Sequence, residues 1–258
     1  MPLLSANLNV MEKACKKASK LLIRDFGEIE KLQVSKKGPG DFVTNSDKRT
    51  EKIIINELSL ARPDYSFLAE ESGSSGKNTE FRWIIDPIDG TTNFVRGVPV
   101  WGSLIALVHN EVPVVSVVSA PALGMRWWAS VGDGAYFNGT RIYVSTVSEL
   151  SDAHVSTTPN TGWEKVGGLP ALQQLQVDAL RSRGFGDFWQ HMLVAQGAID
   201  VAIDAIGLAP YDNAAIYPIV QEAGGTITDR IGKSNWRANS LVSSNGLLHS
   251  TVIDRLPS

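Results

Sequence analysis

One segment, residues 83–94, constrains this chain more than any other, and it reads WIIDPIDGTTNF. Its apolar start is typical of a buried strand that ends at Asp86, where Pro87 forces a turn, and Asp89 follows before a run able to open a helix. Two carboxylates brought close together repel each other unless they share a proton or a cation, and N–H groups at a helix start suit a phosphate. An isolated Asp-x-x-Asp would more often cap a helix. The residues around this one favour a divalent metal instead.

Acidic residues also lie at the ends of other predicted elements. Glu70 and Glu71 follow a short apolar strand, and Asp212 precedes a predicted helix, where it could serve as an N-cap. Asp41 and Asp47 flank the start of another helix, whose dipole favours an acid in its first turn. Each has an ordinary explanation, such as solvent exposure. Together they lie where an α/β enzyme places its active site.

The chemistry of these groups narrows the choice of metal. All of them offer hard oxygen ligands, which select magnesium or manganese over zinc. The single cysteine, Cys15, excludes a disulfide framework and a cysteine-based zinc site. We interpret each histidine as a core or surface residue rather than a catalyst: His109, His154, His191 and His249.

Composition excludes several classes of protein. The chain has 258 residues, 43% of them hydrophobic, so it can bury a sizeable core, and disorder is excluded as its main state. A formal net charge of −3 lacks the basic footprint that nucleic-acid binding needs. No run approaches the roughly 20 apolar residues that span a bilayer, and the N-terminus lacks a secretory signal pattern. We therefore expect a soluble, cytoplasmic protein with no membrane or nucleic-acid partner.

Apolar spacing predicts the order of helices and strands. The predicted helices are 5–25, about 46–60, 188–196 and 212–223. The predicted strands are 66–69, 81–85, 104–108, 112–119, 126–130, 141–145, 153–157, 199–203 and 226–228. Residues 35–40 should form an exposed, mobile loop, and Asn138-Gly139 suits a two-residue hairpin turn. The pattern predicts a β-rich N-terminal subdomain over 1–147 and an α/β C-terminal subdomain over 148–258 that completes the site.

Four spaced blocks of this sequence resemble the signatures of the inositol monophosphatase family. Residues 86–94 (DPIDGTTNF) resemble the first signature, and 211–215 (YDNAA), followed by 222–225 (EAGG), resemble the second. Residues 70–72 (EES) and 41–47 (DFVTNSD) match the remaining blocks. The blocks occur in the family's order, and the resemblance runs through nearly the whole chain.

The resemblance implies a layered α/β fold, an α-β-α-β-α sandwich that usually forms a homodimer, and magnesium-dependent hydrolysis of small phosphate monoesters. It implies two to three metal sites, in which manganese can substitute for magnesium. By position, Glu70, Asp86 and the carbonyl of Ile88 would hold the first metal. Asp86, Asp89 and Asp212 would hold the second, and Glu70 would contribute to a weaker third.

The resemblance also implies roles for the residues around the metals. Thr91, with Asp47 behind it and Glu70 beside it, would orient the attacking water. The backbone N–H groups of Gly90 and Thr91 would hold the phosphate. Coordination of water to a divalent ion lowers its pKa toward neutrality, so this chemistry requires no histidine acid.

The second half of the chain looks most like the histidinol-phosphatase branch of the family. Residues 183–189 (RGFGDFW) and 210–212 (PYD) carry this likeness, which implies histidinol phosphate as the substrate and a place in histidine biosynthesis. Gly186 and Asp187 are candidate substrate contacts, with Asp187 pairing with the cationic amine. Spacing alone explains Asp187 equally well as a helix N-cap.

A third candidate substrate contact, Asp204, lies where this sequence departs from the family. The family generally has a substrate-contacting Glu before the second signature. Counting from Asp200 places Asp204 at that position, whereas counting back from Asp212 places Ala205 there, because the loop is one residue longer.

Other functions stay open at this point. Within the same class, the substrate could be inositol 1-phosphate or another sugar or nucleotide phosphate. In a different class, the chain could keep the fold and work by binding RNA or a protein as a regulatory member. The acidic balance disfavours RNA, and the intact metal positions favour the enzyme.

Overall fold

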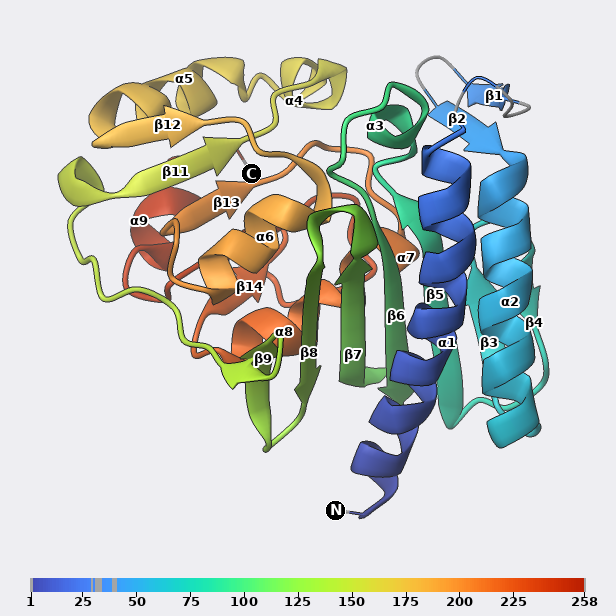
Figure 1. The fold of residues 1–258 in the computed structure, drawn as a ribbon. Coiled ribbons are helices and arrows are strands. Elements are labelled where there is room, and N and C mark those ends of the chain that lie inside the picture. The colour runs from blue at the N-terminus through green and yellow to red at the C-terminus, as the bar shows by residue number, and fades with distance from the viewer. Residues whose placement is uncertain (1, 29, 31–33, 39–40, 258) are drawn as a thin grey trace.

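The protein folds into five alternating layers of helices and sheets (Figure 1). The structure is a computed structural model and describes residues 2–28, 30, 34–38 and 41–257. Helices α1 (Pro2–Phe26) and α2 (Asn45–Ala61) form the first layer, followed by an eight-stranded sheet. A middle helical layer, a five-stranded sheet and an outer helical layer complete the stack. The predicted α-β-α-β-α sandwich is confirmed.

The eight-stranded sheet has the order β10-β9-β8-β7-β6-β5-β3-β4. Only the β3–β5 pair is parallel among the pairings described for it. Asn138 and Gly139 have φ of 47° and 84° in the β9–β10 connection, so the predicted hairpin turn is confirmed. The strands are β3 (Ser66–Ala69), β4 (Gly73–Ser75), β5 (Phe81–Asp89), β6 (Gly102–His109), β7 (Val112–Ala120), β8 (Met125–Ser130), β9 (Gly134–Phe137) and β10 (Thr140–Arg141).

Both faces of this sheet are covered, which explains its nearly continuous apolar strands. Trp83 and Ile85 of β5 pack under α1 and α2 with Met11 and Leu58, whereas Ile84 between them faces the opposite core. This alternation follows from the two-residue period of a strand. It holds β5, and the acids at its end, rigidly between two hydrophobic clusters.

A small antiparallel hairpin precedes α2. It pairs β1 (Val34–Gly38) with β2 (Asp41–Thr44). The predicted loop is therefore wrong for residues 35–38, because strand pairing satisfies backbone groups that the glycine-rich sequence suggested would face water. Residues 39–40 of that prediction lie outside the described residues.

The five-stranded sheet has the order β12-β11-β13-β15-β14 and is parallel only around β11. Its strands all follow residue 153, so the subdomain boundary that we propose at 147/148 falls between the two sheets. The strands are β11 (His154–Thr157), β12 (Arg181–Arg183), β13 (Val201–Ile203), β14 (Thr226–Thr228) and β15 (Val242–Ser244).

The remaining helices cover the second sheet and border the site. Helices α6 (Asp187–Ala195) and α8 (Ile216–Glu222) lie between the sheets and form the largest core cluster with β5–β8. The predicted helix over 212–223 is interrupted at Ala214-Ala215, because Pro218 has no N–H to bond the carbonyl of residue 214. The other helices are α3 (Thr91–Val95), α4 (Thr161–Lys165), α5 (Leu169–Asp178), α7 (Pro210–Asn213), α9 (His249–Ile253), and the short 3₁₀ turns η2 (Pro121–Leu123) and η3 (Leu150–Asp152).

Within the described residues, no helix combines the length and the apolar character needed to cross a bilayer.

Candidate metal-binding active site

Strand β5 delivers two of the predicted ligands through a bulge. Asp86 pairs with Leu104 of β6 and Asp89 with Gly102, so three steps along β5 oppose two along β6. The prediction that the strand stops at Asp86 is wrong, because Pro87 lies in the bulge, where a residue without an N–H is tolerated. Residues three apart in a regular strand point to opposite faces. The bulge lets the carboxylates of Asp86 and Asp89 lie close together on one side of the strand.

Asp212, from the second half of the chain, lies beside Asp86 and Asp89. Its carboxylate accepts a hydrogen bond from the N–H of Ala209 at 2.7 Å, and Ala209 is the N-cap of α7, so the prediction of Asp212 as N-cap is wrong. One carboxylate oxygen from each of Asp86, Asp89 and Asp212 lies within 4.8 Å of the others. No described ion pair joins these three acids to a lysine or arginine.

The three acids resist ionisation in this arrangement. Burial, followed by the charge of Glu70, raises the pKa of Asp86 well above its usual range. Burial and then the charge of Asp187 do the same to the pKa of Asp89. Burial raises the pKa of Asp212 to about 7, against the hydrogen bond from the Ala209 N–H. Converging acids without a paired cation are costly to ionise, and a divalent ion among them removes that cost.

The donor set fits magnesium or manganese. It consists of carboxylate oxygens on converging elements, with the Ile88 carbonyl nearby, and these are hard ligands. Within the described residues, the cluster that meets the spacing for a metal contains no histidine or cysteine, as a zinc site usually would.

Thr91 begins α3 beside these acids. Its hydroxyl lies 3.1 Å from Oδ1 of Asp47 and 2.8 Å from the carbonyl oxygen of Ile88. Asp47 is fully buried, and its Oδ2 accepts the N–H of Thr44 at 2.7 Å in a capping box at the start of α2. Asp47 is therefore both a first-turn acid and a partner of Thr91. Burial raises its pKa.

Gly90 makes the tight connection between β5 and α3. Its φ is +83°, and a Cβ there would lie 3.0 Å from the carbonyl oxygen of Val100. It is the N-cap residue of α3, so neither Asp86 nor Asp89 holds that position, and Oδ2 of Asp89 instead accepts the N–H of Phe188 in the first turn of α6 at 2.8 Å. The backbone of Gly90 and Thr91 can thus approach an anion closely.

Glu70 follows β3, which is parallel to β5, so both strands end at the same edge of the sheet. The charge of Glu70 contributes to the raised pKa of Asp86 and Asp212, which places it beside the cluster. The next residue is anchored, because the N–H of Glu71 donates to Oε2 of the buried Glu51 at 2.7 Å. The side chain of Asp41 lies outside the described residues.

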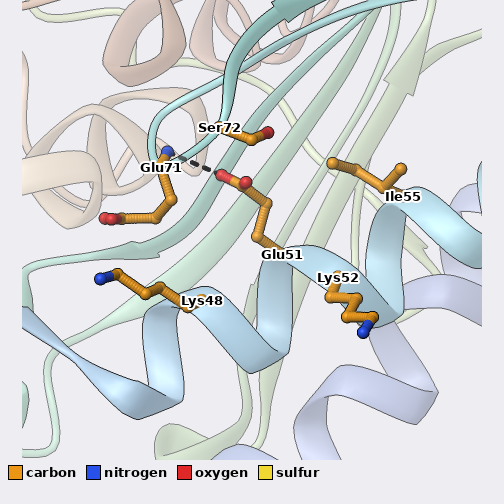
Figure 2. A pocket seen from close by; sticks show the side chains of 6 residues that line it. All are labelled: Lys48, Glu51, Lys52, Ile55, Glu71 and Ser72. Atoms are coloured by element: carbon orange, nitrogen blue, oxygen red, sulfur yellow. Dashed lines mark hydrogen bonds between the residues drawn. The ribbon is translucent and has the colours of Figure 1, made fainter.

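A surface pocket of about 340 Å³ lies behind this turn (Figure 2). In Figure 2 the side chain of Glu71 extends away from Glu51, on the same side of the view as Lys48. The pocket lies against the segment that follows Glu70, and the three clustered acids do not line it. Its lining residues are Lys48, Glu51, Lys52, Ile55, Glu71 and Ser72.

Asp187 lies at the first position of α6. Gly186, with φ of +74°, is the N-cap, so the alternative that Asp187 is the N-cap is wrong, and the N–H of Phe188 in this first turn donates to Oδ2 of Asp89 at 2.8 Å. Instead, Oδ2 of Asp187 accepts a hydrogen bond from the amide of Asn93 at 3.0 Å. Burial, and then the charge of Asp204, raise the pKa of Asp187 to about 6.

Asp204 follows β13 and is buried. Its carboxylate accepts the N–H of Ala205 at 2.7 Å and lies 3.1 Å from Nε2 of His191. Its charge contributes to the raised pKa of Asp89, Asp187 and Asp212. Of the two residues that the sequence left open here, Asp204 supplies a carboxylate near Asp187, and Ala205 donates its backbone N–H to that carboxylate. Substrate contact by Asp204 stays a prediction.

Comparison with known proteins is consistent with this geometry. The model of the inositol monophosphatase family matches residues 4–257. The chain belongs to the inositol monophosphatase family. The histidinol-phosphatase of Streptomyces coelicolor is 43% identical over 234 residues, covering 87% of each chain, and the inositol-1-monophosphatase of Mesorhizobium japonicum is 38% identical, covering 96% and 95%. The crystal structure of extragenic suppressor protein suhB from Bartonella henselae has a TM-score of 0.91 at 37% identity, covering 97% and 98%.

Membership of the inositol monophosphatase family confirms the resemblance drawn from the sequence, including the likeness to histidinol-phosphatases. The protein is a phosphoric monoester hydrolase of this family. The structure brings Asp86, Asp89 and Asp212 together and places Thr91 against Asp47. The catalytic roles of these residues in this phosphatase are proposed below.

The sequence does not predict the roles of two residues near the site. Asn93 belongs to a predicted helix start, and its side-chain amide holds Asp187. His191, a predicted core or surface histidine, is fully buried and also bonds Asp204. One available signal was the spacing of His191, four residues after Asp187, which puts both on one face of a helix.

Proposed function

We propose that this phosphatase hydrolyses histidinol phosphate in a magnesium-dependent reaction. The observation that carries the proposal is the division of its acids into two groups. Asp86, Asp89 and Asp212 converge within 4.8 Å and suit a divalent metal. Asp187 and Asp204 interact electrostatically beside them and suit the cationic amine of an amino alcohol phosphate.

The metal-holding roles are those that the family resemblance implies, and the convergence of Asp86, Asp89 and Asp212 supports them. Glu70, Asp86 and the Ile88 carbonyl would hold one magnesium ion, and Asp86, Asp89 and Asp212 a second, with Glu70 contributing to a weaker third. Manganese could replace magnesium at these oxygen ligands. When bound, the ions would neutralise the clustered carboxylates and lower the pKa of water.

Thr91 and Asp47 would orient the water that attacks phosphorus. The Thr91 hydroxyl has one proton, and both of its neighbours, the Asp47 carboxylate and the Ile88 carbonyl, are acceptors. The lone pairs of Thr91 therefore remain able to accept a hydrogen bond from water while its proton is directed at an acceptor. Asp47, buried and fixed by Thr44, is suited to help remove a proton from the nucleophile.

The start of α3 would hold the phosphate. The backbone N–H groups of Gly90 and Thr91 lie at the helix start, where a phosphate binds favourably. Gly186, Asp187 and Asp204 would contact the remainder of the substrate. An ammonium group would gain more than a neutral hydroxyl from two neighbouring carboxylates, because it offsets their mutual repulsion.

Inositol 1-phosphate is the second candidate substrate. It is supported by the relative from Mesorhizobium japonicum named inositol-1-monophosphatase. A neutral inositol would leave the charges of Asp187 and Asp204 uncompensated, which favours the amino substrate.

Phosphate release from a substrate panel tests the proposal. With saturating magnesium we expect kcat/KM for histidinol phosphate to exceed that for inositol 1-phosphate by about tenfold or more, the value of a charged hydrogen bond. A chelator should abolish both reactions, and re-added magnesium should restore them. The reverse preference would assign the inositol substrate, and no release from either ester would favour a binding role.

We also propose that the protein is a cytoplasmic homodimer, as the resemblance implied. Light scattering coupled to size-exclusion chromatography would give twice the chain mass of 27.9 kDa. A monomer at micromolar concentration would contradict this proposal without affecting the chemistry above.

A further inference from the structure

A buried histidine joins the two halves of the substrate side of the site. His191 lies on α6, four residues after Asp187, so the two share a face of that helix. Its side chain is fully buried, with Nε2 at 3.1 Å from Oδ2 of Asp204 and Nδ1 at 2.7 Å from Oγ of Ser243. Asp204 follows β13, and Ser243 lies on the neighbouring strand β15.

The partners of His191 determine where its proton lies. A carboxylate can only accept, so Nε2 carries the hydrogen that points to Asp204. Nδ1 lies 2.7 Å from the hydroxyl of Ser243, which is itself fully buried and is able to pair with this nitrogen as donor or acceptor. The contact with Ser243 fixes the orientation of the ring, so His191 can serve Asp204 as a directional donor.

The other contacts of Asp204 leave it suited to a ligand. Its Oδ1 accepts the N–H of Ala205 at 2.7 Å, and its backbone carbonyl accepts the indole N–H of Trp163 at 2.7 Å. Each carboxylate oxygen thus has one protein donor, and each retains a lone pair for another. Asp204 contacts His191, which lies one helical turn after Asp187 on α6, and its charge raises the pKa of Asp187, so the two carboxylates lie on the same side of the site.

We propose that His191 is a positioning residue for substrate recognition: with Ser243, it holds Asp204 in the orientation in which Asp204 and Asp187 bind a cationic amine together. The inference rests on the proposed phosphatase function. It adds that the His191 imidazole sets the separation between the first turn of α6 and the end of β13. Loss of its N–H would free the Asp204 carboxylate to rotate and would weaken binding of the amine, while hydrolysis of a bound ester continues.

The test compares His191→Phe, which keeps a ring but removes both nitrogens, with His191→Gln, which retains a donor near the position of Nε2. At saturating magnesium we expect His191→Phe to raise KM for histidinol phosphate about tenfold, the value of a hydrogen bond to a charged group, with kcat changed by less than about twofold. His191→Gln should restore KM to within about threefold of the wild type. Neither variant should alter the KM of neutral inositol 1-phosphate.

His249 provides a matched control. It is also buried and bonds two hydroxyl groups, of Thr228 at 2.8 Å and Ser244 at 3.0 Å, but it has no carboxylate partner among these contacts. His249→Phe should lower stability and leave the ratio of the two KM values unchanged. If His191→Phe behaves like His249→Phe, or if Gln fails to rescue it, His191 has only a packing role and the inference is wrong.

A spectroscopic measurement separates the inference from the proposed function. In ¹⁵N-labelled wild-type protein without substrate, the His191 ring should show a protonated Nε2. Ser243→Ala should broaden or shift the ring signals and raise KM for histidinol phosphate about threefold, which keeps the test available if His191→Phe does not fold. A ring without a proton on Nε2 would overturn the inference. A wild-type enzyme that prefers inositol 1-phosphate would overturn the proposed substrate instead.

Discussion

The Asp187 carboxylate accepts a hydrogen bond from the Asn93 side chain at 3.0 Å, across 94 residues of sequence. The same amide donates to the carbonyl of Val100 at 2.9 Å, so Asn93 is held at both of its donor hydrogens. The contact ties the start of α6 to α3, and hence the proposed amine site to the proposed phosphate site. A fixed separation between these sites would favour substrates whose phosphate and amine groups are the matching distance apart.

Asp187→Asn should remove charge without disturbing the backbone. Asp187 has φ of 48°, a region that Asn tolerates and most other residues avoid. We expect kcat/KM for histidinol phosphate to fall about tenfold or more, because a charge-assisted contact is lost. The value for inositol 1-phosphate should change by less than about twofold. Equal losses with both esters, measured by phosphate release, would show that Asp187 has only a structural role.

Asp86→Asn should lower the activity and raise the stability of the metal-free protein. Because Asp86 is proposed to bind both metal ions, its loss as a ligand should lower kcat about a hundredfold or more. Because burial and neighbouring acids raise the pKa of Asp86, its neutral replacement should raise the Tm of the metal-free protein at pH 7.5. Circular dichroism would verify the fold and calorimetry the Tm. Full turnover together with an unchanged magnesium dependence would contradict the metal role.

Thr91→Val should lower kcat about a hundredfold, within the usual effect of a proton-transfer group, while KM changes little. Valine keeps the branched shape but removes the hydroxyl that meets Asp47 and Ile88. Thr91→Ser retains that hydroxyl and serves as the control. If the serine variant is as slow as the valine variant, the methyl group rather than the hydroxyl matters.

Without metal, stability should decrease as the pH rises toward neutrality. The folded-state pKa values of Asp187 (about 6) and Asp212 (about 7) lie above their ordinary value of 3.8, so the folded state binds protons more tightly than the unfolded state. The stabilising contribution is present below about pH 4 and is lost as the pH rises through about 7. We expect Tm to fall by about 3 °C or more between pH 5 and pH 7.5.

Magnesium should reverse this pH dependence. Cations bound among ionised acids replace the protons, so Tm at pH 7.5 should rise with magnesium concentration, and more than it does at pH 5. A metal-free Tm that rises over this pH range would show that the acids do not repel one another as the geometry implies.

Gly90→Ala should destabilise the protein by about 1–2 kcal/mol from its left-handed backbone alone, and by more from the 3.0 Å approach of a Cβ to the Val100 carbonyl. Gly132→Ala is the matched control, because Gly132 has φ of +85° and no atom within 4 Å of its Cβ position. The difference in the free energy of unfolding between the two variants, from urea titration, isolates the contact. Equal values would mean that the backbone at Val100 shifts away from the new Cβ at no cost in stability.

Much of this protein could be predicted from local patterns. The spacing of Met11, Cys15, Ala18 and Leu22 predicts α1, and all four are buried. Asn138-Gly139 predicts its turn from the positive φ that both positions need. Such features depend on neighbours within a few residues, so a single sequence displays them. The hairpin at 34–44 could not be predicted, because its strands are short and the lysines and glycines at 36–40 favour a loop.

Residue types alone predict the kinds of ligand available, and the spaced motifs predict the family and, through that resemblance, the order of the layers. Which groups meet depends on tertiary packing: the bulge that brings Asp89 to the side of Asp86, the Asn93 amide that holds Asp187, and the imidazole of His191 against Asp204. These contacts join residues far apart in the chain. Their geometry is fixed by how whole layers pack, which no local spacing encodes.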